Sequence, residues 1–290
     1  MAREDYEANE KDIDRVNEIT GLELEAGRRD GQETEDGFVP SHPLDDPQTL
    51  CRALVETIAN EGPEEYAYFA NENRQRIADA AQRDESVIEV LLIGYKMGIT
   101  LGNAACMNDL GALYYMGELV PQDYAKAAEL YHMAMQAGCY QSIINLGYIY
   151  EYGRIGRPDH QKAFQYYALA AALAPSCEAT YKLGDMYSRG VAVERDMCVA
   201  NALWEKAFEL ANNREDLAQP AARIAKLLMD PDCAQWDIKP DPLRALSLYQ
   251  TAEVGLRLSI ANGATYYKKR LQEVIEGQGW ARELVELMGA

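Results

Sequence analysis

The sequence predicts an all-α solenoid of stacked helix pairs, with a period of about 36 residues and helical caps at both ends. First, a Leu-Gly dipeptide recurs with its glycine at Gly111, Gly147 and Gly184, spaced by 36 and 37 residues. Second, a further glycine and then an aspartate follow at intervals of six residues in all three copies. Third, each copy ends in a stripe of alanine, tyrosine or tryptophan, and alanine, spaced by four and three residues.

Each copy has the pattern of two helices. The first helix carries the Leu-Gly dipeptide, whose glycine should lie at a close contact between helices, and it ends at the second glycine, which suits a left-handed C-terminal cap. The aspartate suits the N-cap of the second helix, because its carboxylate accepts hydrogen bonds from free backbone N–H groups. A lone pair leaves apolar surface exposed, so neighbouring pairs must stack. The predicted capping residues are Gly117, Gly153 and Gly190, and Asp123, Asp159 and Asp196.

The array extends beyond these three copies in both directions. Residues 90–102 match a second helix one period upstream, and residues 221–230 match a degenerate first helix. A second helix with Asp241 as its N-cap follows, after a loop with four extra residues. We therefore predict an acidic, largely disordered tail at 1–44, N-terminal capping helices at 45–86, the repeat array at 87–258 and C-terminal capping helices at 259–290.

The chain is acidic, with a formal net charge of −19, and its first 48 residues carry 15 acidic against 5 basic residues. An acidic protein repels phosphate backbones and anionic membrane surfaces, so we expect neither as a partner. The N-terminus lacks the apolar core of a secretory signal, and the most apolar window, 87–102, is too short to span a bilayer. We expect a cytoplasmic protein with reduced cysteines, since none of the six has zinc-site or redox-motif spacing.

The repeat columns resemble the Sel-one-like repeat, a relative of the tetratricopeptide repeat, and residues 103–138 follow that pattern almost throughout. The resemblance covers roughly residues 87–258. It implies a right-handed α-solenoid that acts as an adaptor or scaffold for partner proteins, and we expect a bacterial source. A secreted branch of the family joins cysteines eight residues apart. Gly98 stands where Cys106 would need its partner, so we do not transfer the activity of that branch.

Relatives of the tetratricopeptide type bind peptides in a concave groove lined by the first helices. Carried over position by position, the groove columns hold aromatic and amide residues and then a basic cluster. A basic cluster in an acidic protein suggests an acidic peptide or a C-terminal carboxylate as ligand, and a merely solvated concave face is the alternative. The predicted groove residues are Asn108, Tyr115, Asn145, Tyr148, Tyr152, Tyr181, Lys182, Asp185, Arg189, Arg223 and Lys226, and the basic cluster is Lys182, Arg189, Arg223 and Lys226.

Catalytic chemistry is not indicated by any motif. The three histidines, His42, His132 and His160, form no recognisable set with a nucleophile, and the glycines form no phosphate-binding loop. We therefore predict a scaffold without enzymatic activity, cofactor or metal, which binds another protein or a peptide segment in the groove. The alternative is a hydrolase of small cyclic or glycan-like ligands, which rests on remote family association alone.

The acidic tail is a candidate intramolecular ligand of the groove. It is tethered to the same chain as the basic cluster, so even a weak charge contact can be populated. A short helix with Ile13 and Val16 on one side would place these side chains against Tyr148 or Tyr181. The alternative is a solubilising tail that touches nothing.

Overall fold

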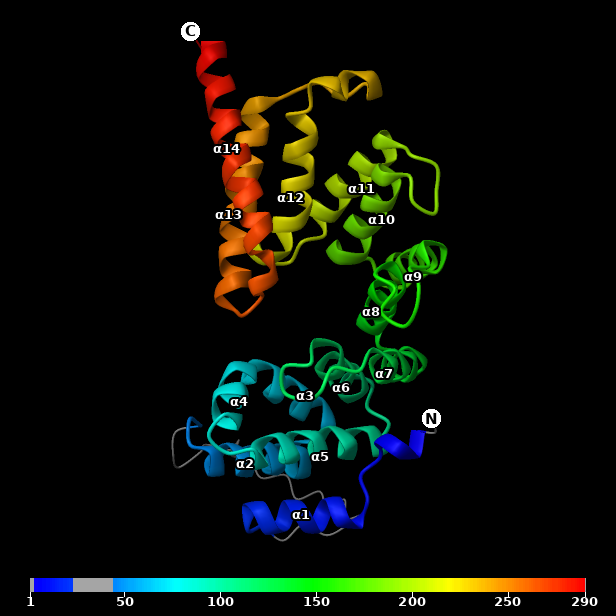
Figure 1. The fold of residues 1–290 in the computed structure, drawn as a ribbon, viewed down its shortest axis with the longest axis vertical. Coiled ribbons are helices and arrows are strands. Elements are labelled where there is room, and N and C mark those ends of the chain that lie inside the picture. The colour runs from blue at the N-terminus through cyan, green and yellow to red at the C-terminus, as the bar shows by residue number, and fades with distance from the viewer. Residues whose placement is uncertain (1–2, 23–43, 290) are drawn as a thin grey trace. The chain divides into compact units, whose positions relative to one another are not determined.

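The computed structural model describes residues 3–22 and 44–289, which form helices and turns with no strand among them (Figure 1). The helices follow one another as packed consecutive pairs, so the predicted all-α architecture of stacked helix pairs is confirmed. The chain divides into two compact units. Unit 1 comprises Met1–Ile149 with Arg154–Gly156, and unit 2 comprises Tyr150–Gly153 with Arg157–Ala290.

Unit 1 contains the N-terminal helices and the first repeat. Its short helices surround α5, the most apolar helix of the unit. The bounds are η1 (Arg3–Tyr6), α1 (Glu10–Thr20), α2 (Pro47–Glu56), the π-helical turn η2 (Thr57–Glu61), α3 (Pro63–Glu72), α4 (Arg74–Ala81), α5 (Ser86–Thr100), α6 (Ala104–Met116), α7 (Tyr124–Gln136) and α8 (Tyr140–Glu151), whose last two residues belong to unit 2.

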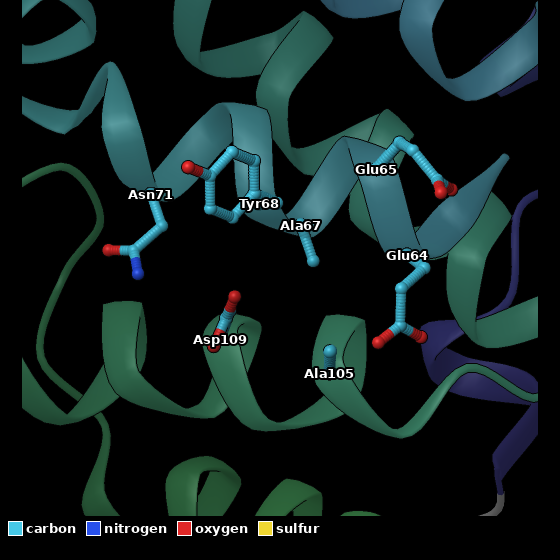
Figure 2. Close-up of a pocket in the computed structure, with 7 residues that line it drawn as sticks. All are labelled: Glu64, Glu65, Ala67, Tyr68, Asn71, Ala105 and Asp109. Atoms are coloured by element: carbon cyan, nitrogen blue, oxygen red, sulfur yellow. The ribbon is translucent and has the colours of Figure 1, made fainter. Parts of the chain in front are cut away.

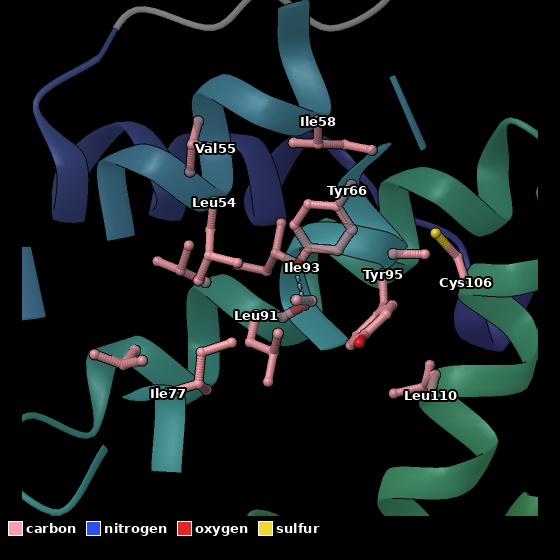
Figure 3. Packing of buried hydrophobic residues seen from close by; sticks show 14 of the residues in the cluster. Leu54, Val55, Ile58, Tyr66, Ile77, Leu91, Ile93, Tyr95, Cys106 and Leu110 are labelled. Carbon is pink, nitrogen blue, oxygen red and sulfur yellow. Dashed lines mark hydrogen bonds between the residues drawn. The ribbon is translucent and has the colours of Figure 1, made fainter. Parts of the chain in front are cut away.

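The core of unit 1 gathers around Tyr66 of α3 (Figure 3). This side chain is fully buried, and its hydroxyl donates a hydrogen bond of 2.7 Å to the main-chain oxygen of Leu91. Its ring meets the Tyr95 ring edge to face, with the centroids 5.3 Å apart. Gly94 of α5 lies against the Tyr66 ring with no room for a Cβ atom. Buried Leu54 and its neighbours complete a close-packed aliphatic shell around the ring.

Unit 2 contains the later repeats and the C-terminal helices. Its core is anchored by Trp204 and Tyr249, which are buried against α10 and α14 at Gly184 and Gly277. The bounds are α9 (His160–Leu173), α10 (Cys177–Arg189), α11 (Met197–Glu209), α12 (Arg214–Leu228), η3 (Pro231–Trp236), α13 (Pro242–Ala261), η4 (Thr265–Tyr267) and α14 (Lys268–Gly289).

The repeats show the predicted caps. Gly117 and Gly190 end α6 and α10 in the left-handed conformation, with φ of 70° and 65°. The Asp123 side chain accepts hydrogen bonds of 3.0 Å from the backbone N–H groups of Ala125 and Lys126 at the start of α7. The other predicted aspartates each accept one backbone hydrogen bond at their helix starts, and they are Asp159, Asp196 and Asp241.

Two of the three Leu-Gly glycines, Gly111 and Gly184, lie at close helix contacts, as predicted. A Cβ atom built on Gly111 would come within 2.9 Å of the Tyr131 ring, and one built on Gly184 within 2.6 Å of Nε1 of Trp204. Real Cβ contacts are longer than this, so a larger residue forces the helices apart. In these two repeats the glycine and the aromatic residue therefore fit together as one packing unit.

Helix α12 differs from the sequence prediction, because it begins at Arg214 and not near residue 221. Pro220 lies inside the helix, where it supplies no N–H group for the oxygen of Asp216. The thiol of Cys177 from α10 donates a hydrogen bond of 3.3 Å to this oxygen and compensates for the missing donor. The four extra residues of the following loop are part of the 3₁₀ helix η3.

The N-terminal tail also differs from the prediction. Residues 3–22 are folded, with α1 capped by Asn9 and packed on α2 and α5, whereas disorder was expected. The short helix suggested by Ile13 and Val16 is present, but it docks on α2 and α5 rather than against Tyr148 or Tyr181. The apolar side of α1 packs against α2 and α5, where Val16 is 1% exposed. Residues 23–43 lie outside the described part of the chain.

Candidate functional site

The structure places the predicted groove residues on the first helix of each pair or directly after it. Those up to Tyr148 belong to unit 1 and the others to unit 2. Lys226 is exposed on its helix. In unit 1, α6 carries Asn108 and Tyr115, and α8 carries Asn145 and half-buried Tyr148. Tyr152 directly follows the last residue of α8. In unit 2, α10 carries Tyr181, Lys182, Asp185 and Arg189, and α12 carries Arg223 and Lys226.

In unit 1 the amide residues form a hydrogen-bonded row between α6 and α8. Nδ2 of Asn145 donates to Oδ1 of Asn108 at 3.0 Å, and Nδ2 of Asn108 donates to Oδ1 of Asp109 at 3.0 Å. Tyr115 belongs to a different cluster, where Nε of Arg154 donates to its hydroxyl at 3.3 Å and the guanidinium lies over its ring. The structure therefore brings the two amides together and separates them from Tyr115.

A cavity of about 450 Å³ opens between α3 and α6 at the acidic end of this row (Figure 2). Asp109 points from α6 toward α3, where Tyr68 is 70% exposed. Burial raises the pKa of Asp109, although the hydrogen bond from Asn108 and the charge of Arg74 oppose this shift. Sequence reasoning missed the cavity because it assigned α3 to a cap. The other lining residues are Glu64, Glu65, Ala67, Asn71 and Ala105.

Glu151 at the end of α8 is the centre of a buried charge cluster in unit 2. Its carboxylate lies 2.6 Å from Nζ of Lys182 and 2.7 Å from Nη2 of Arg189, and it accepts a hydrogen bond of 2.8 Å from the hydroxyl of Tyr167. The side chains of Glu151 and Lys182 are only 3% and 6% exposed. Nζ of Lys182 also lies 5.3 Å from the ring centroid of Tyr152. This cluster fixes the orientation of the two groove residues at its edge, Tyr152 and Arg189.

Glu151 is ionised at neutral pH. Burial alone would raise the pKa of Glu151, but the charge of Lys182 and the hydrogen bonds from Lys182, Arg189 and Tyr167 outweigh burial and hold this pKa below its usual value. Burial and the neighbouring Glu151 charge raise the pKa of Tyr167. Glu151 therefore keeps its negative charge, and Tyr167 keeps its proton.

A second cluster joins α10, α11 and α12. The Arg223 guanidinium pairs with Asp185 through Nε and Nη2, with Nη2 2.6 Å from Oδ2. Nε1 of Trp204 donates to the same carboxylate at 3.1 Å, and the guanidinium carbon lies 4.7 Å from the ring centroid of Tyr181. Nη1 of Arg223 donates to the main-chain and side-chain oxygens of Gln219 at 2.8 Å. Arg223 is thus a structural link between the first helices of neighbouring repeats.

Three of the four cations of the predicted basic cluster are paired with carboxylates of the protein itself. Lys182 and Arg189 share Glu151, and Arg223 pairs with Asp185. The pairing was not recognised in the sequence because the partners are far apart in the chain. The sequence did contain a signal for this pairing, because each arginine follows its carboxylate partner by 38 residues, which is close to the length of one repeat. Of the paired cations, Arg189 keeps the most exposed side chain, at 46%.

Within residues 3–22 and 44–289, no group of three or more His, Cys, Asp or Glu side chains is placed to hold a metal ion. All six cysteines are free thiols. No helix in the same part of the chain combines the length and the apolar character needed to cross a membrane.

Comparison with known proteins identifies the repeats. The family model of the Sel1 repeat matches residues 104–139, 141–175, 177–212 and 233–252. The last match is short, in agreement with the degenerate fourth pair. No curated protein sequence gives a significant match.

Two solved structures illustrate the similarity. A Sel1 repeat protein from Oxalobacter formigenes shares 27% identity over 47% of this chain and 97% of its own, with a TM-score of 0.39. A protective antigen of uropathogenic Escherichia coli strains, described as displaying an SLR fold, shares 19% identity over 81% of this chain, with a TM-score of 0.45. This chain covers 46% of the length of the E. coli protein.

Proposed function

The chain is a Sel1 repeat protein, and this repeat generally serves as a protein-interaction scaffold; we propose that the chain binds a segment of a partner protein along the first helices of its repeats. The proposal includes the groove residues predicted from the sequence. It also includes a cytoplasmic location, because the chain is acidic and its cysteines are free thiols.

The observation that carries the proposal is the buried charge cluster around Glu151. Burying a lysine and a glutamate costs desolvation energy that apolar side chains of similar volume would avoid, so stability alone is a weak reason for this pair. Shifted pKa values and buried charge pairs concentrate at functional sites. Here the cluster holds Tyr152, which is 50% exposed, and Arg189 in fixed orientations at the surface. Exposed tyrosine and arginine side chains of this kind are enriched at protein interfaces.

The ligand that fits this surface is a carboxylate, either an acidic side chain or the C-terminus of a partner. Arg189 uses Nη2 for Glu151 and Nε for the main-chain oxygen of Asp185. Its remaining guanidinium nitrogen, Nη1, can donate to a carboxylate from outside, and charge-assisted hydrogen bonds of this type are strong. The ring of Tyr152 lies beside Lys182 and offers an apolar surface to the same ligand. Lys182 itself is too buried to contact a ligand.

The proposal is tested by site-specific photo-crosslinking of the full chain in cells. Benzoylphenylalanine replaces Tyr152 in one version and Tyr266 in the matched control, since Tyr266 is also an exposed tyrosine, 66% exposed, but lies outside the repeats. We expect a discrete partner segment with acidic residues or a free C-terminus to crosslink at position 152 and not at 266. Arg189→Gln should reduce this product about tenfold, because a hydrogen bond between charged groups is worth ~1.5–3 kcal/mol.

Identical crosslinking patterns at positions 152 and 266 would show that this surface does not select a partner. A product that is unaffected by Arg189→Gln would exclude the carboxylate as the recognised group. The contacts described above do not favour a hydrolase, so this alternative is not proposed.

A further inference from the structure

The N-terminal segment Arg3–Thr20 covers a surface of unit 1 that belongs to α2, α5 and α7. Helix α1 packs along α5 and α2 (Figure 1). Val16 is 1% exposed on the inner side of α1, and Tyr6 is 4% exposed at the beginning of the segment. The hydroxyl of Tyr6 donates a hydrogen bond of 3.1 Å to Oε2 of Glu129 on α7. The segment is thus anchored by buried Tyr6 near its beginning and by buried Val16 and Thr20 near its end.

Charged contacts set the register of α1 on this surface. Oδ1 of Asp12 lies 3.1 Å from Nζ of Lys96, and Nε of Arg15 lies 2.7 Å from Oε2 of Glu89. The bound helix therefore has a specific pattern, with an acid four residues before the buried Val16 and a base directly before it. This is the helix-in-groove mode of peptide recognition, in which anchors on one helix face enter an apolar surface.

The segment is held less firmly than the helices beneath it. A helix of 11 residues is marginal in water without tertiary contacts. The Arg15 and Glu89 side chains are 44% and 48% exposed, and exposed ion pairs contribute little. A cavity of about 190 Å³ also remains beside Tyr6, and Asp5 of the segment itself lines it together with Leu92, Leu110, Tyr114, Lys96 and Lys126. Terminal segments with few buried side chains can open before the rest of a fold, and opening of this segment would expose the surface beneath it.

We infer that the surface of α2, α5 and α7 is a second binding surface, which the segment Arg3–Thr20 occupies in cis and which accepts an acidic amphipathic helix of a partner protein. The pattern of α1 identifies the partner helix, because an acid at the position of Asp12 pairs with Lys96 and an apolar side chain at the position of Val16 is buried. The segment acts as a competitor because its attachment to the same chain gives it a high effective concentration. This surface is separate from the one around Tyr152 and does not depend on it.

The test uses a fluorescein-labelled synthetic peptide of residues 1–22 as the probe and the full chain as the receptor. Val16→Asp in the full chain should release the segment, and binding of the peptide should then become at least about tenfold tighter than to the wild type. Tyr6→Ala, at the other anchor, should have the same effect. Asp14→Asn is the matched control, because Asp14 is exposed on the same helix and should leave binding as in the wild type.

A charge reversal locates the binding. Lys96→Glu, added to the Val16→Asp chain, should weaken peptide binding about tenfold, and a peptide with Asp12→Lys should restore it. Tyr152→Ala should leave peptide binding unchanged. The inference is overturned if both release variants keep their circular dichroism spectrum and bind the peptide no tighter than the wild type. It is also overturned if the charge-reversed peptide fails to restore binding.

Discussion

Glu151→Gln removes one negative charge from the interior of unit 2 and keeps the size and shape of the side chain. Lys182 then loses the carboxylate 2.6 Å from its ammonium group, although its own side chain is 6% exposed. The glutamine amide has a single, uncharged oxygen, so it can replace the acceptor of the Tyr167 hydroxyl or that of the Arg189 guanidinium, which bind different oxygens of Glu151, but not both. The variant therefore tests the charge separately from packing.

The expected loss of stability follows from the burial of this pair. Removing one partner of a buried ion pair costs ~3–5 kcal/mol, because the other charge stays buried without compensation. The glutamine oxygen can recover ~1 kcal/mol as an acceptor. A net loss of ~2–4 kcal/mol remains, and it lowers the melting temperature by about 2–4 °C for each kcal/mol in a protein of this size. We expect a decrease of about 4–16 °C at neutral pH.

Calorimetry at pH 7 and at acidic pH measures both the size and the origin of the effect. The pKa of Glu151 lies below its usual value in the folded protein. Its ionised form therefore stabilises the fold above the ordinary glutamate pKa of about 4.3, and this contribution is lost as the pH falls through the lowered folded value. The difference between Glu151→Gln and the wild type should shrink in this acidic range.

The matched control is Glu205→Gln, which breaks the more exposed ion pair of Glu205 with Arg244, where the side chains are 30% and 48% exposed. This change should cost at most about 1 kcal/mol, because exposed pairs are screened by water. If both variants melt at the same temperature at pH 7, the buried charge of Glu151 does not stabilise unit 2 and the reasoning is refuted.

Three further predictions concern packing, capping and redox state. Gly184→Ala should destabilise by ~1–3 kcal/mol through its clash with Trp204, whereas Gly279→Ala, which meets no atom within 4 Å, should be neutral or stabilising in thermal unfolding. Asp123→Ala should cost ~0.5–2 kcal/mol in urea titration, because α7 loses its N-cap, and an unchanged midpoint would contradict this role. Dithiothreitol should leave the melting temperature unchanged, since all six cysteines are free thiols, and a decrease would reveal a disulfide.

The sequence by itself determined the helix pairs and their ends. The cap at Asp123 and the left-handed glycine at Gly117 are formed by hydrogen bonds to backbone groups a few residues away, so residue type and spacing are sufficient to predict them. The contact between Gly184 and Trp204 was also predictable, because a glycine and an aromatic residue recur at these two positions in all three copies and only a glycine lets the ring approach so closely. Periodicity thus identified the packing residues, and with them the repeat family.

Only the tertiary structure decided which charges are available to a partner. Glu151 and Arg189 are 38 residues apart, and whether they pair depends on the stacking of neighbouring repeats and on the rotamers of two long side chains. The surface on which α1 docks also depends on the tertiary structure. An apolar helix face can pack on several surfaces, and α1 packs on the one that α2 and α5 form together. The free energy of long-range pairing and docking comes from many weak contacts between distant segments, and a local residue pattern does not predict which of these contacts form.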